Sequence, residues 1–490
     1  ASKTYDGTTN ASVSGGSIAG LTADETAISP ALSLAFATSN FADANAGTGK
    51  AVTLGGVSLT NAAWNITGLN ATVTGGSTGT INKANLVLSG TKVYDGTTVV
   101  AGSQLIATGV HNESFAILGV GAAGNLSSAN VQGGATTLAS LSSLSLGSSN
   151  GTNTGSALNY NAISTTGSSF TVTPATAKLV ATKTYDGDTT LTGSQLTITG
   201  VTVGGTTQTL GYTGTASLFD ANVAMANNYV TGVGLALADG TGLANNYVLP
   251  ALSYGVKNSA TVTAKPITVS LTAPGSSYTY DGVTSYSSIA SGLTAYTTNT
   301  PMVGSETIAS LNYAVTSNGV AVSAGVAQAG NIIVTPSLNT LGGGGVASNY
   351  SFTFNALTVP VAKAVLTVGN ATSVANKTYD GTTTAALSGG SLSGVLGSDS
   401  LTLVEAGTFA SVNAGTGIVV TAADTVTGTA ANNYTITQPT GLTADITPKA
   451  LTVSGTSVAS KTYNGNTTAT HTGGTLVGVV TGDNVTLTQA

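Results

Sequence analysis

The chain has 490 residues, of which 6% are charged and 41% hydrophobic, and its formal net charge is −6. Every basic residue is lysine, and the absence of arginine, the side chain best suited to clamping phosphates, argues against nucleic-acid binding. The chain has no cysteine, which excludes disulfides, thiolate metal sites and cysteine nucleophiles. No apolar run approaches the roughly 20 residues of a membrane-spanning helix, and the apolar content is too high for a disordered chain.

One short motif, Lys-Thr-Tyr-Asp-Gly-Thr-Thr, recurs with small changes at intervals of about 90 residues and divides the chain into repeat modules. Its central tripeptides are Tyr5-Asp6-Gly7, Tyr94-Asp95-Gly96, Tyr185-Asp186-Gly187, Tyr280-Asp281-Gly282, Tyr379-Asp380-Gly381 and Tyr463-Asn464-Gly465. Asp-Gly between alternating residues predicts a type I′ β-hairpin turn, in which both central residues need positive φ. A tyrosine before such a turn can place its ring at the edge of the core and offer its hydroxyl to a partner.

The last copy of the motif separates a structural role from a catalytic one. Asn464 replaces the aspartate of the other copies, which keeps the turn chemistry but would remove a catalytic carboxylate. We therefore interpret all six tripeptides as structural hairpin turns.

A second landmark, an Asn-Tyr pair, follows the second to fifth Tyr-Asp-Gly turns, at 159–160, 246–247, 349–350 and 433–434. In the first module Trp64 takes this aromatic position. The two landmarks predict modules at 1–83 (without its opening strand), 84–177, 178–264, 265–363, 364–448 and 449–490 (truncated). The chain begins and ends inside a repeat, so we expect a segment of a longer protein.

The stretches that join the modules have the pattern of β-strands. Residues 442–447, 450–454, 262–269 and 359–368 alternate with period two, and no Gly/Ser-rich linker separates them. Helical periodicity is confined to 22–37, where Pro30 interrupts it. We predict an all-β fold, a tandem array of small β-sandwich or β-grasp-like modules of about 90 residues that forms an elongated rod on the order of 150–200 Å long.

Ten lysines occupy two repeated positions. Those before the motif tyrosine are Lys3, Lys92, Lys183, Lys377 and Lys461, and those at the predicted junctions are Lys83, Lys178, Lys265, Lys363 and Lys449. They either protect strand edges from pairing with other chains or form isopeptide cross-links with buried acids. The glutamates (Glu25, Glu113, Glu306 and Glu405) do not recur at one position, which favours edge protection.

No cofactor, metal or catalytic site is expected. Asp186 and Asp188 are a close acidic pair, but the pair is not repeated, so a calcium site in each module is not expected. His111 and His471 are isolated, which argues against zinc binding and against a histidine-based triad. Asn-x-Ser/Thr triplets such as those at Asn112 and Asn484 permit glycosylation.

Two further stretches carry a family resemblance. One is Ile-Thr-Pro-Lys-Ala-Leu-Thr-Val at 446–453, followed by the turn at Tyr463, and the other is Phe-Ala-Ser-Val-Asn-Ala-Gly-Thr-Gly at 409–417, echoed at 41–50. They resemble the YDG-type repeat modules, with their MBG relatives, of large bacterial secreted adhesins, the exoproteins similar to filamentous haemagglutinin. The fourth module departs most, with Tyr278 in place of the lysine. The resemblance implies a stalk that is exported by a bacterium and has no enzymatic activity.

We expect a non-catalytic structural stalk or fibre segment of an extracellular or cell-surface bacterial adhesin or biofilm-matrix protein. Its partners would be neighbouring copies of itself, other surface or matrix components, and a host or abiotic surface, with no nucleic acid and no membrane span in this segment. One alternative is a self-assembling extracellular filament, joined end to end by strand complementation from residues 449–490. Another is a glycan-binding surface module, which would need clustered aromatic residues or paired carboxylates.

Overall fold

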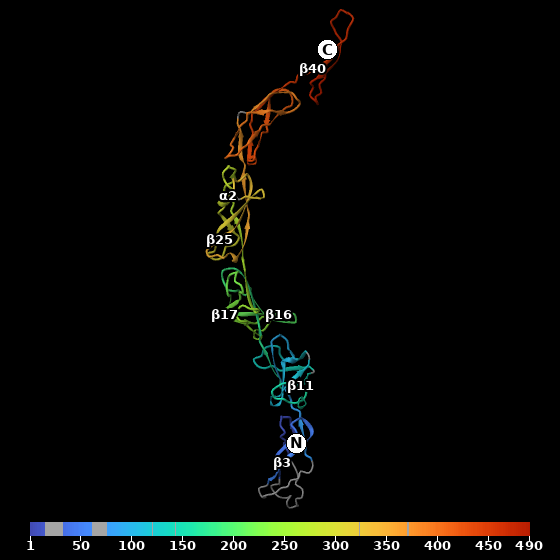
Figure 1. The fold of residues 1–490 in the computed structure, drawn as a ribbon, viewed down its shortest axis with the longest axis vertical. Coiled ribbons are helices and arrows are strands. Elements are labelled where there is room, and N and C mark those ends of the chain that lie inside the picture. The colour runs from blue at the N-terminus through green and yellow to red at the C-terminus, as the bar shows by residue number, and fades with distance from the viewer. Residues whose placement is uncertain (15–32, 61–75, 120, 143, 323, 370–371) are drawn as a thin grey trace, which may run out of the picture. The chain divides into compact units, whose positions relative to one another are not determined.

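The computed structural model describes residues 1–490 except 15–32, 61–75, 120, 143, 323 and 370–371 (Figure 1). The described residues form many short strands in small sheets, with a single seven-residue α-helix, α2 (Tyr286–Gly292), and a few one-turn 3-10 helices. This confirms the predicted all-β fold class. None of the helices in the described part of the chain is both long and apolar enough to span a membrane.

The chain divides into two compact units, Ala1–Thr263 and Ala264–Ala490. The boundary between them lies next to the predicted module boundary at 264/265. Figure 1 labels elements of both units.

In the part of the first unit that the structure describes, the strands form five sheets. One has the order β1-β4-β3-β2, two have the orders β10-β9-β6 and β11-β8-β7-β5-β12, and the remaining two have the orders β13-β18 and β17-β16-β15-β14-β19. The strand bounds are β1 Ser2–Thr4, β2 Ser33–Phe41, β3 Gly47–Thr60, β4 Thr78–Asn82, β5 Val87–Val93, β6 Val99–Ala101, β7 Leu105–Thr108, β8 Ser114–Leu118, β9 Ala122–Leu126, β10 Leu138–Leu141, β11 Ser145–Ser149, β12 Ser169–Thr173, β13 Ala175–Thr176, β14 Lys178–Thr184, β15 Leu196–Val203, β16 Thr206–Leu218, β17 Val230–Ala238, β18 Tyr247–Val248 and β19 Asn258–Thr263.

The described residues of the second unit form seven sheets, with the orders β22-β20-β26, β21-β27-β25-β23-β24, β33-β28-β38, β29-β32, β30-β39-β36-β35-β31, β34-β37 and β40-β41. The strand bounds are β20 Lys265–Leu271, β21 Tyr278–Thr279, β22 Tyr296–Thr298, β23 Thr307–Ser317, β24 Val320–Ala321, β25 Gly330–Gly342, β26 Tyr350–Asn355, β27 Leu357–Ala362, β28 Ala364–Val368, β29 Ser373–Val374, β30 Lys377–Thr378, β31 Thr384–Ala385, β32 Leu387–Ser388, β33 Leu392–Ser393, β34 Thr402–Val404, β35 Gly407–Phe409, β36 Gly415–Ala422, β37 Thr425–Thr427, β38 Tyr434–Thr437, β39 Thr443–Thr447, β40 Thr452–Val458 and β41 His471–Val477.

One parallel pairing recurs in every complete repeat. The strand that leads into the turn motif pairs in parallel with the last strand of the same repeat, as β1 with β4, β5 with β12, β14 with β19, β21 with β27 and β30 with β39. Parallel neighbours end at the same edge of a sheet, and the chain continues into the next repeat from the end of the second strand. The turn therefore lies beside the start of the following repeat.

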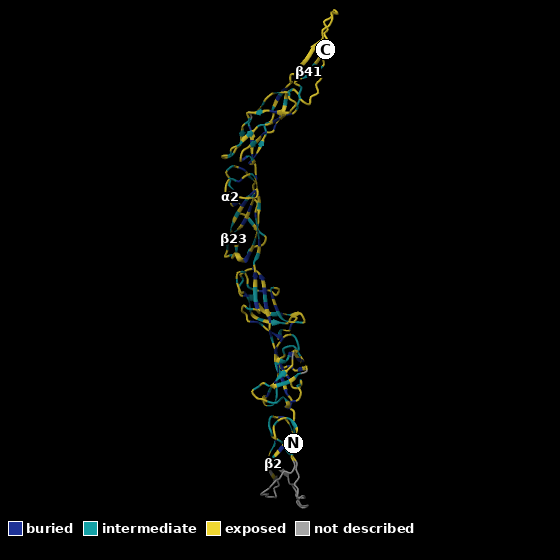
Figure 2. Cartoon of the chain, turned by 45° about the vertical axis from the view of Figure 1, so that its right-hand side comes forward, coloured by how far each residue is buried: buried dark blue, intermediate teal, exposed yellow. Residues whose placement is uncertain are grey.

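The strands bury alternate residues, as the period-two pattern predicts. Strand β28 alternates buried and exposed residues along its whole length. One apolar cluster of the second unit joins Tyr280 and Val334 of the fourth predicted module to Leu366 and Tyr434 of the fifth, so the core continues across that junction. In Figure 2 buried residues follow the strands within the units, whereas β40 is exposed and β41 is exposed or of intermediate burial.

One predicted module boundary needs correction, and part of the stretch in which Pro30 argued against a helix lies outside the described residues. The sheet that pairs Ala175–Thr176 with Tyr247–Val248 crosses the predicted boundary at 177/178, which places the start of that module before Ala175. The end of the stretch at 22–37 belongs to strand β2 and is not helical. Residues 22–32 of that stretch, together with Trp64, lie outside the described residues.

Candidate functional site

The aspartate of each motif closes a tight turn with its own side chain. Oδ1 of Asp6 accepts hydrogen bonds from the backbone N–H of Thr8 at 2.9 Å and from its hydroxyl at 2.8 Å. Asp95 and Asp380 repeat both contacts. Gly7 follows with φ of 75°, a conformation that glycine adopts at little cost. The motif is an Asx turn.

The predicted type I′ hairpin is wrong. Its first central residue would need positive φ, but none of the motif aspartates, nor Asn464, has positive φ. The strands on either side of the turn also do not pair with each other, since β5 pairs with β7 and β12 while β6 pairs with β9 in another sheet. A turn of the predicted kind occurs at Asn318-Gly319, where both φ values are positive and the flanking Ser317 and Val320 are paired.

The motif lysine stabilises the turn through an ion pair with the motif aspartate and hydrogen bonds to backbone carbonyl oxygens of the turn. Nζ of Lys92 lies 2.8 Å from Oδ1 of Asp95 and donates to the carbonyl oxygens of Thr97 and Val99 at 3.0 and 2.7 Å. Lys92 is 4% exposed and Lys183 is 3% exposed. Both lie on interior strands of five-stranded sheets, so the edge-protection interpretation is wrong for these two.

The cross-link interpretation also fails for these two lysines, because an isopeptide bond requires a buried acid and their acidic partners are exposed. The side chains of Asp95 and Asp186 are 53% and 52% exposed. In the first copy, burial opposes ionisation of Asp6, but hydrogen bonds from Lys3 and Thr8 outweigh it and lower the pKa of this carboxyl to about 2.

The motif tyrosine reaches out of its own module and into the following one. Oη of Tyr5 donates to Oε1 of Glu113 at 2.7 Å, and Oη of Tyr160 donates to Oε2 of the same carboxylate at 2.7 Å. The two rings meet edge to face, with centroids 5.5 Å apart and an interplanar angle of 80°. We call these three residues the first junction cluster.

The same arrangement recurs twice with a different acceptor. In the second junction cluster (Tyr94, Tyr247 and Gln208), Oε1 of the glutamine accepts both hydroxyls. In the third (Tyr280, Tyr434 and Asp399), Oδ2 accepts both at 2.7 Å. The ring centroids lie 5.3 and 5.4 Å apart, at 81° and 77°.

The motif tyrosines of the remaining copies lie at the same point of their turns. Oη of Tyr379 donates to Oδ1 of Asp483 at 2.8 Å. Tyr185 is buried, and its backbone N–H extends the parallel ladder to the carbonyl oxygen of Thr263. Tyr463 is 93% exposed.

Each junction cluster also binds the backbone of the module that supplies its acceptor. The hydroxyl of Tyr160 accepts the N–H of Val110 at 2.8 Å. Equivalent bonds join the N–H of Val201 to Tyr247 at 3.0 Å and the N–H of Leu396 to Tyr434 at 3.0 Å. These hydroxyls thus both donate and accept, as buried polar groups require.

The motif glycine is required by contact as well as by φ. A Cβ on Gly7 would lie 2.9 Å from Nδ1 of His111, one on Gly96 would lie 2.0 Å from Cγ2 of Val203, and one on Gly381 would lie 2.8 Å from Cγ1 of Val480. Each of these side chains comes from the following module. A Cβ on Gly465, in the last copy, would meet nothing within 4 Å.

The asparagine of the Asn-Tyr landmark is a second link, and the sequence interpretation assigned it no role. Oδ1 of buried Asn159 accepts the N–H of Ala46 at 2.9 Å, and its Nδ2 donates to Oδ1 of Asn45 at 3.1 Å. Asn246 makes the same pair of contacts with Val131 and Asn130, and Asn433 with Ala329 and Gln328. The repetition of the Asn-Tyr pair was the signal that could have found this link.

Burial and the shared acceptor keep the tyrosines neutral. Burial, followed by the hydrogen bond to Glu113, raises the pKa of Tyr5 to about 12. Burial and the hydrogen bond to Asp399 raise the pKa of Tyr280 to about 12. The pKa values of Tyr160 and Tyr434 are raised by the same two causes. Neutral hydroxyls here serve as hydrogen-bond donors.

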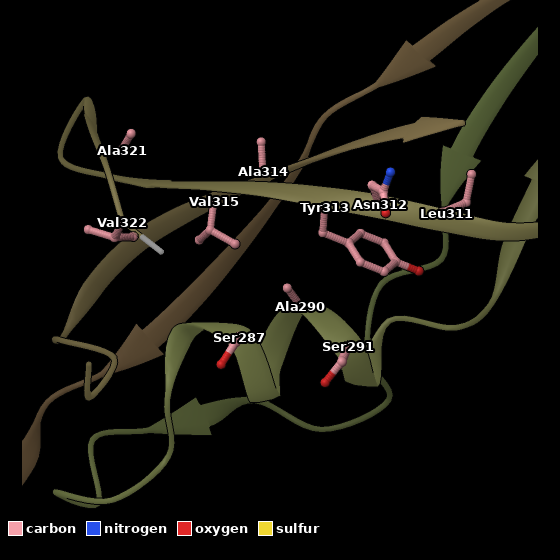
Figure 3. Close-up of a pocket in the computed structure, with 10 residues that line it drawn as sticks. All are labelled: Ser287, Ala290, Ser291, Leu311, Asn312, Tyr313, Ala314, Val315, Ala321 and Val322. Atoms are coloured by element: carbon pink, nitrogen blue, oxygen red, sulfur yellow. The ribbon is translucent and has the colours of Figure 1, made fainter. Parts of the chain in front are cut away.

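The described residues contain no group of three or more potential metal ligands. A cavity of about 460 Å³ lies in the fourth module between α2 and strands β23 and β24, and no charged residue lines it. In Figure 3 the hydroxyls of Ser287 and Ser291 point away from Tyr313 on β23, and the Tyr313 hydroxyl donates to the carbonyl oxygen of Leu293. Its polar groups do not converge on a ligand, so the junction clusters are the better candidate site.

Residues 1–75, 362–441 and 447–490 match the family model of the YDG domain. These stretches contain the turns at Tyr5, Tyr379 and Tyr463, so the chain is similar to YDG domains there. No curated protein and no solved structure matches the chain.

Proposed function

We propose that the chain is a non-catalytic stalk or fibre segment, built of tandem β modules that are docked firmly to one another, of a bacterial extracellular adhesin or biofilm-matrix protein. One observation carries the proposal, namely the repetition of a single docking arrangement. The hydroxyls of Tyr5, Tyr94, Tyr280 and Tyr379 each reach an acceptor roughly one module farther along the chain, at Glu113, Gln208, Asp399 and Asp483 respectively.

Physical chemistry supports stiff junctions. Separating two modules would leave a carboxylate or amide without the hydroxyl of the motif tyrosine, at about 1–3 kcal/mol for each buried polar group that loses its partner. It would also expose the apolar residues that both modules share in the second unit. Nearest-neighbour interfaces of this kind stabilise linear arrays, and a stalk needs such interfaces more than it needs a ligand pocket.

The similarity to YDG domains supports the module type. Export, the cell surface and the adhesin context come from the resemblance of the repeats to modules of large bacterial exoproteins. The partners of such a stalk would be neighbouring copies, other surface or matrix components, and a host or abiotic surface.

Small-angle X-ray scattering of the whole chain tests the proposal. Docked modules are expected to give one narrow distance distribution with a maximum dimension on the order of 150–200 Å. Gly96→Val, whose Cβ would clash with Val203, should broaden it. Gly465→Val introduces similar strain at positive φ without a docking contact, so it should leave the distribution unchanged. A broad, compact distribution for the unmodified chain would exclude a stiff stalk.

A second candidate function is a self-assembling filament. In this candidate, chains would be joined end to end by strand complementation from residues 449–490. Electron microscopy of the purified protein separates the two candidates, because continuous fibres would indicate polymerisation and isolated particles a simple stalk. Glycan binding is a weaker candidate, because the cavity at α2 has neither clustered aromatic residues nor paired carboxylates, and a glycan array tests it.

A further inference from the structure

We propose that the junctions differ in acid sensitivity according to their acceptor. Those built on Glu113 and Asp399 weaken in acid, while the one built on Gln208 stays docked. This inference rests on the proposed docking role of the junction clusters.

Glu113 shows why an ionised acceptor is needed. It is 6% exposed, and each of its two carboxylate oxygens accepts one tyrosine hydroxyl. An ionised carboxylate is an acceptor only, whereas a protonated carboxyl carries one O–H donor. Protonation would turn one of the two oxygens toward Tyr5 or Tyr160 as a donor, so at least one of these hydrogen bonds must break or reverse. Reversal conflicts with the acceptor role that Tyr160 already has toward the N–H of Val110.

Other titratable groups face the first junction cluster. Asp6 lies close enough to Tyr5 for its charge to raise the pKa of that tyrosine. The ring of His111 also lies against Gly7.

The third junction cluster isolates the carboxylate. Asp399 faces Tyr280 and Tyr434, and Leu396, which cannot titrate, lies over Gly282. One oxygen, Oδ2, accepts both hydroxyls, so loss of the carboxylate charge weakens two charge-assisted hydrogen bonds at once. A weakening of this junction in acid therefore cannot come from a histidine.

The second junction cluster is a built-in control. The side-chain amide of Gln208 carries no ionisable proton in the range where carboxylates titrate. Its Oε1 accepts from Tyr94 and Tyr247 with the same edge-to-face ring geometry as in the other clusters. The same docking geometry thus occurs with a charged acceptor and with a neutral one in a single chain.

Three backbone amides report on the state of the three clusters. The N–H groups of Val110, Val201 and Leu396 donate to the tyrosines of the first, second and third clusters. Their hydrogen exchange, measured in the whole chain at neutral pH and at about pH 3 and corrected for the intrinsic pH dependence of exchange, tests the proposal. We expect protection at Val110 and Leu396 to fall about tenfold or more in acid, because a hydrogen bond to a charged group contributes more than a neutral one. Protection at Val201 should stay the same.

Exchanging the acceptors gives the matched variants. Asp399→Asn and Glu113→Gln should remove the acid effect at Leu396 and Val110, and Gln208→Glu should create it at Val201. If the three amides respond alike in acid, whether all lose protection or none does, the proposal is overturned while docking stands. Docking itself is read from the N–H groups of Ala46, Val131 and Ala329, which donate across the junctions to Asn159, Asn246 and Asn433. If these amides are unprotected at neutral pH, the docking function itself fails.

Discussion

The hydroxyl of Tyr5 lies 2.7 Å from Oε1 of Glu113, although 108 residues separate them in the chain. The contact joins the turn of one repeat to the interior of the next. Each of the predictions below concerns one part of this junction.

Tyr280→Phe should lower the free energy of unfolding by about 1–3 kcal/mol, because it removes one of the two tyrosine hydroxyls that donate to the Asp399 carboxylate. The ring stays in place, so the loss reports the hydroxyl and its hydrogen bond to Asp399. Urea unfolding of the whole chain measures it. Tyr463→Phe is the control, since Tyr463 is 93% exposed, and an equal effect of the two variants would contradict the role of the cluster.

Asn433→Ala should loosen the junction between the fourth and fifth modules. The variant leaves the N–H of Ala329 and the side chain of Gln328 without their partner, at a cost of about 1–3 kcal/mol for each group that stays buried. Limited proteolysis should then cleave near residue 330 faster than in the unmodified chain. Asn484→Ala, at an exposed position, should have no such effect. Unchanged cleavage in Asn433→Ala would show that the hydrogen bonds of Asn433 are not needed for docking.

High pH should undock the first and third junctions. The pKa of Tyr5 and of Tyr280 is raised from 10.0 to about 12 in the folded protein. The contribution of these neutral tyrosines to stability is therefore fully present below about pH 10 and is lost as pH rises to about 12. Tyrosinate absorbance should show a late-titrating group, which Tyr5→Phe and Tyr280→Phe diminish. Titration of every tyrosine at its ordinary pKa would refute the prediction.

Lys92→Met should destabilise the second module by about 1–3 kcal/mol. Methionine fills similar space, but it leaves the carbonyl oxygens of Thr97 and Val99 without a donor and Asp95 without its counter-charge. Thermal unfolding of the whole chain compares it with Lys461→Met, where the turn is exposed and water can replace the ammonium. Similar melting curves for both variants would mean that burial of Lys92 does not matter.

Several features of the site could be predicted from residues alone and others could not. The tyrosine beside the turn was expected to find a polar partner, because its hydroxyl cannot be buried without one. Which residue is that partner could not be predicted from the sequence. Glu113, Gln208 and Asp399 precede their landmark tyrosines by 47, 39 and 35 residues, so no column of the repeat contains them, and they differ in chemical type.

The turn shows a second limit of sequence interpretation. Asp-Gly and Asn-Gly are strong hairpin signals, and at Asn318-Gly319 the signal is correct. At Asp6-Gly7 the same signal fails, because strand β1 is already paired in parallel with β4 and the chain turns away instead of folding back on itself.

The sequence by itself determined the repeat, the all-β fold class and the positions of the turns, because period, alternation and turn chemistry are local properties of the chain. The tertiary structure decided what the turns do. The parallel pairing of the first and last strands brings each turn to the edge where the next repeat begins, and only there do a tyrosine, a glycine and a distant acceptor meet. Contacts between residues so far apart depend on strand order and on loop length, which no local pattern encodes.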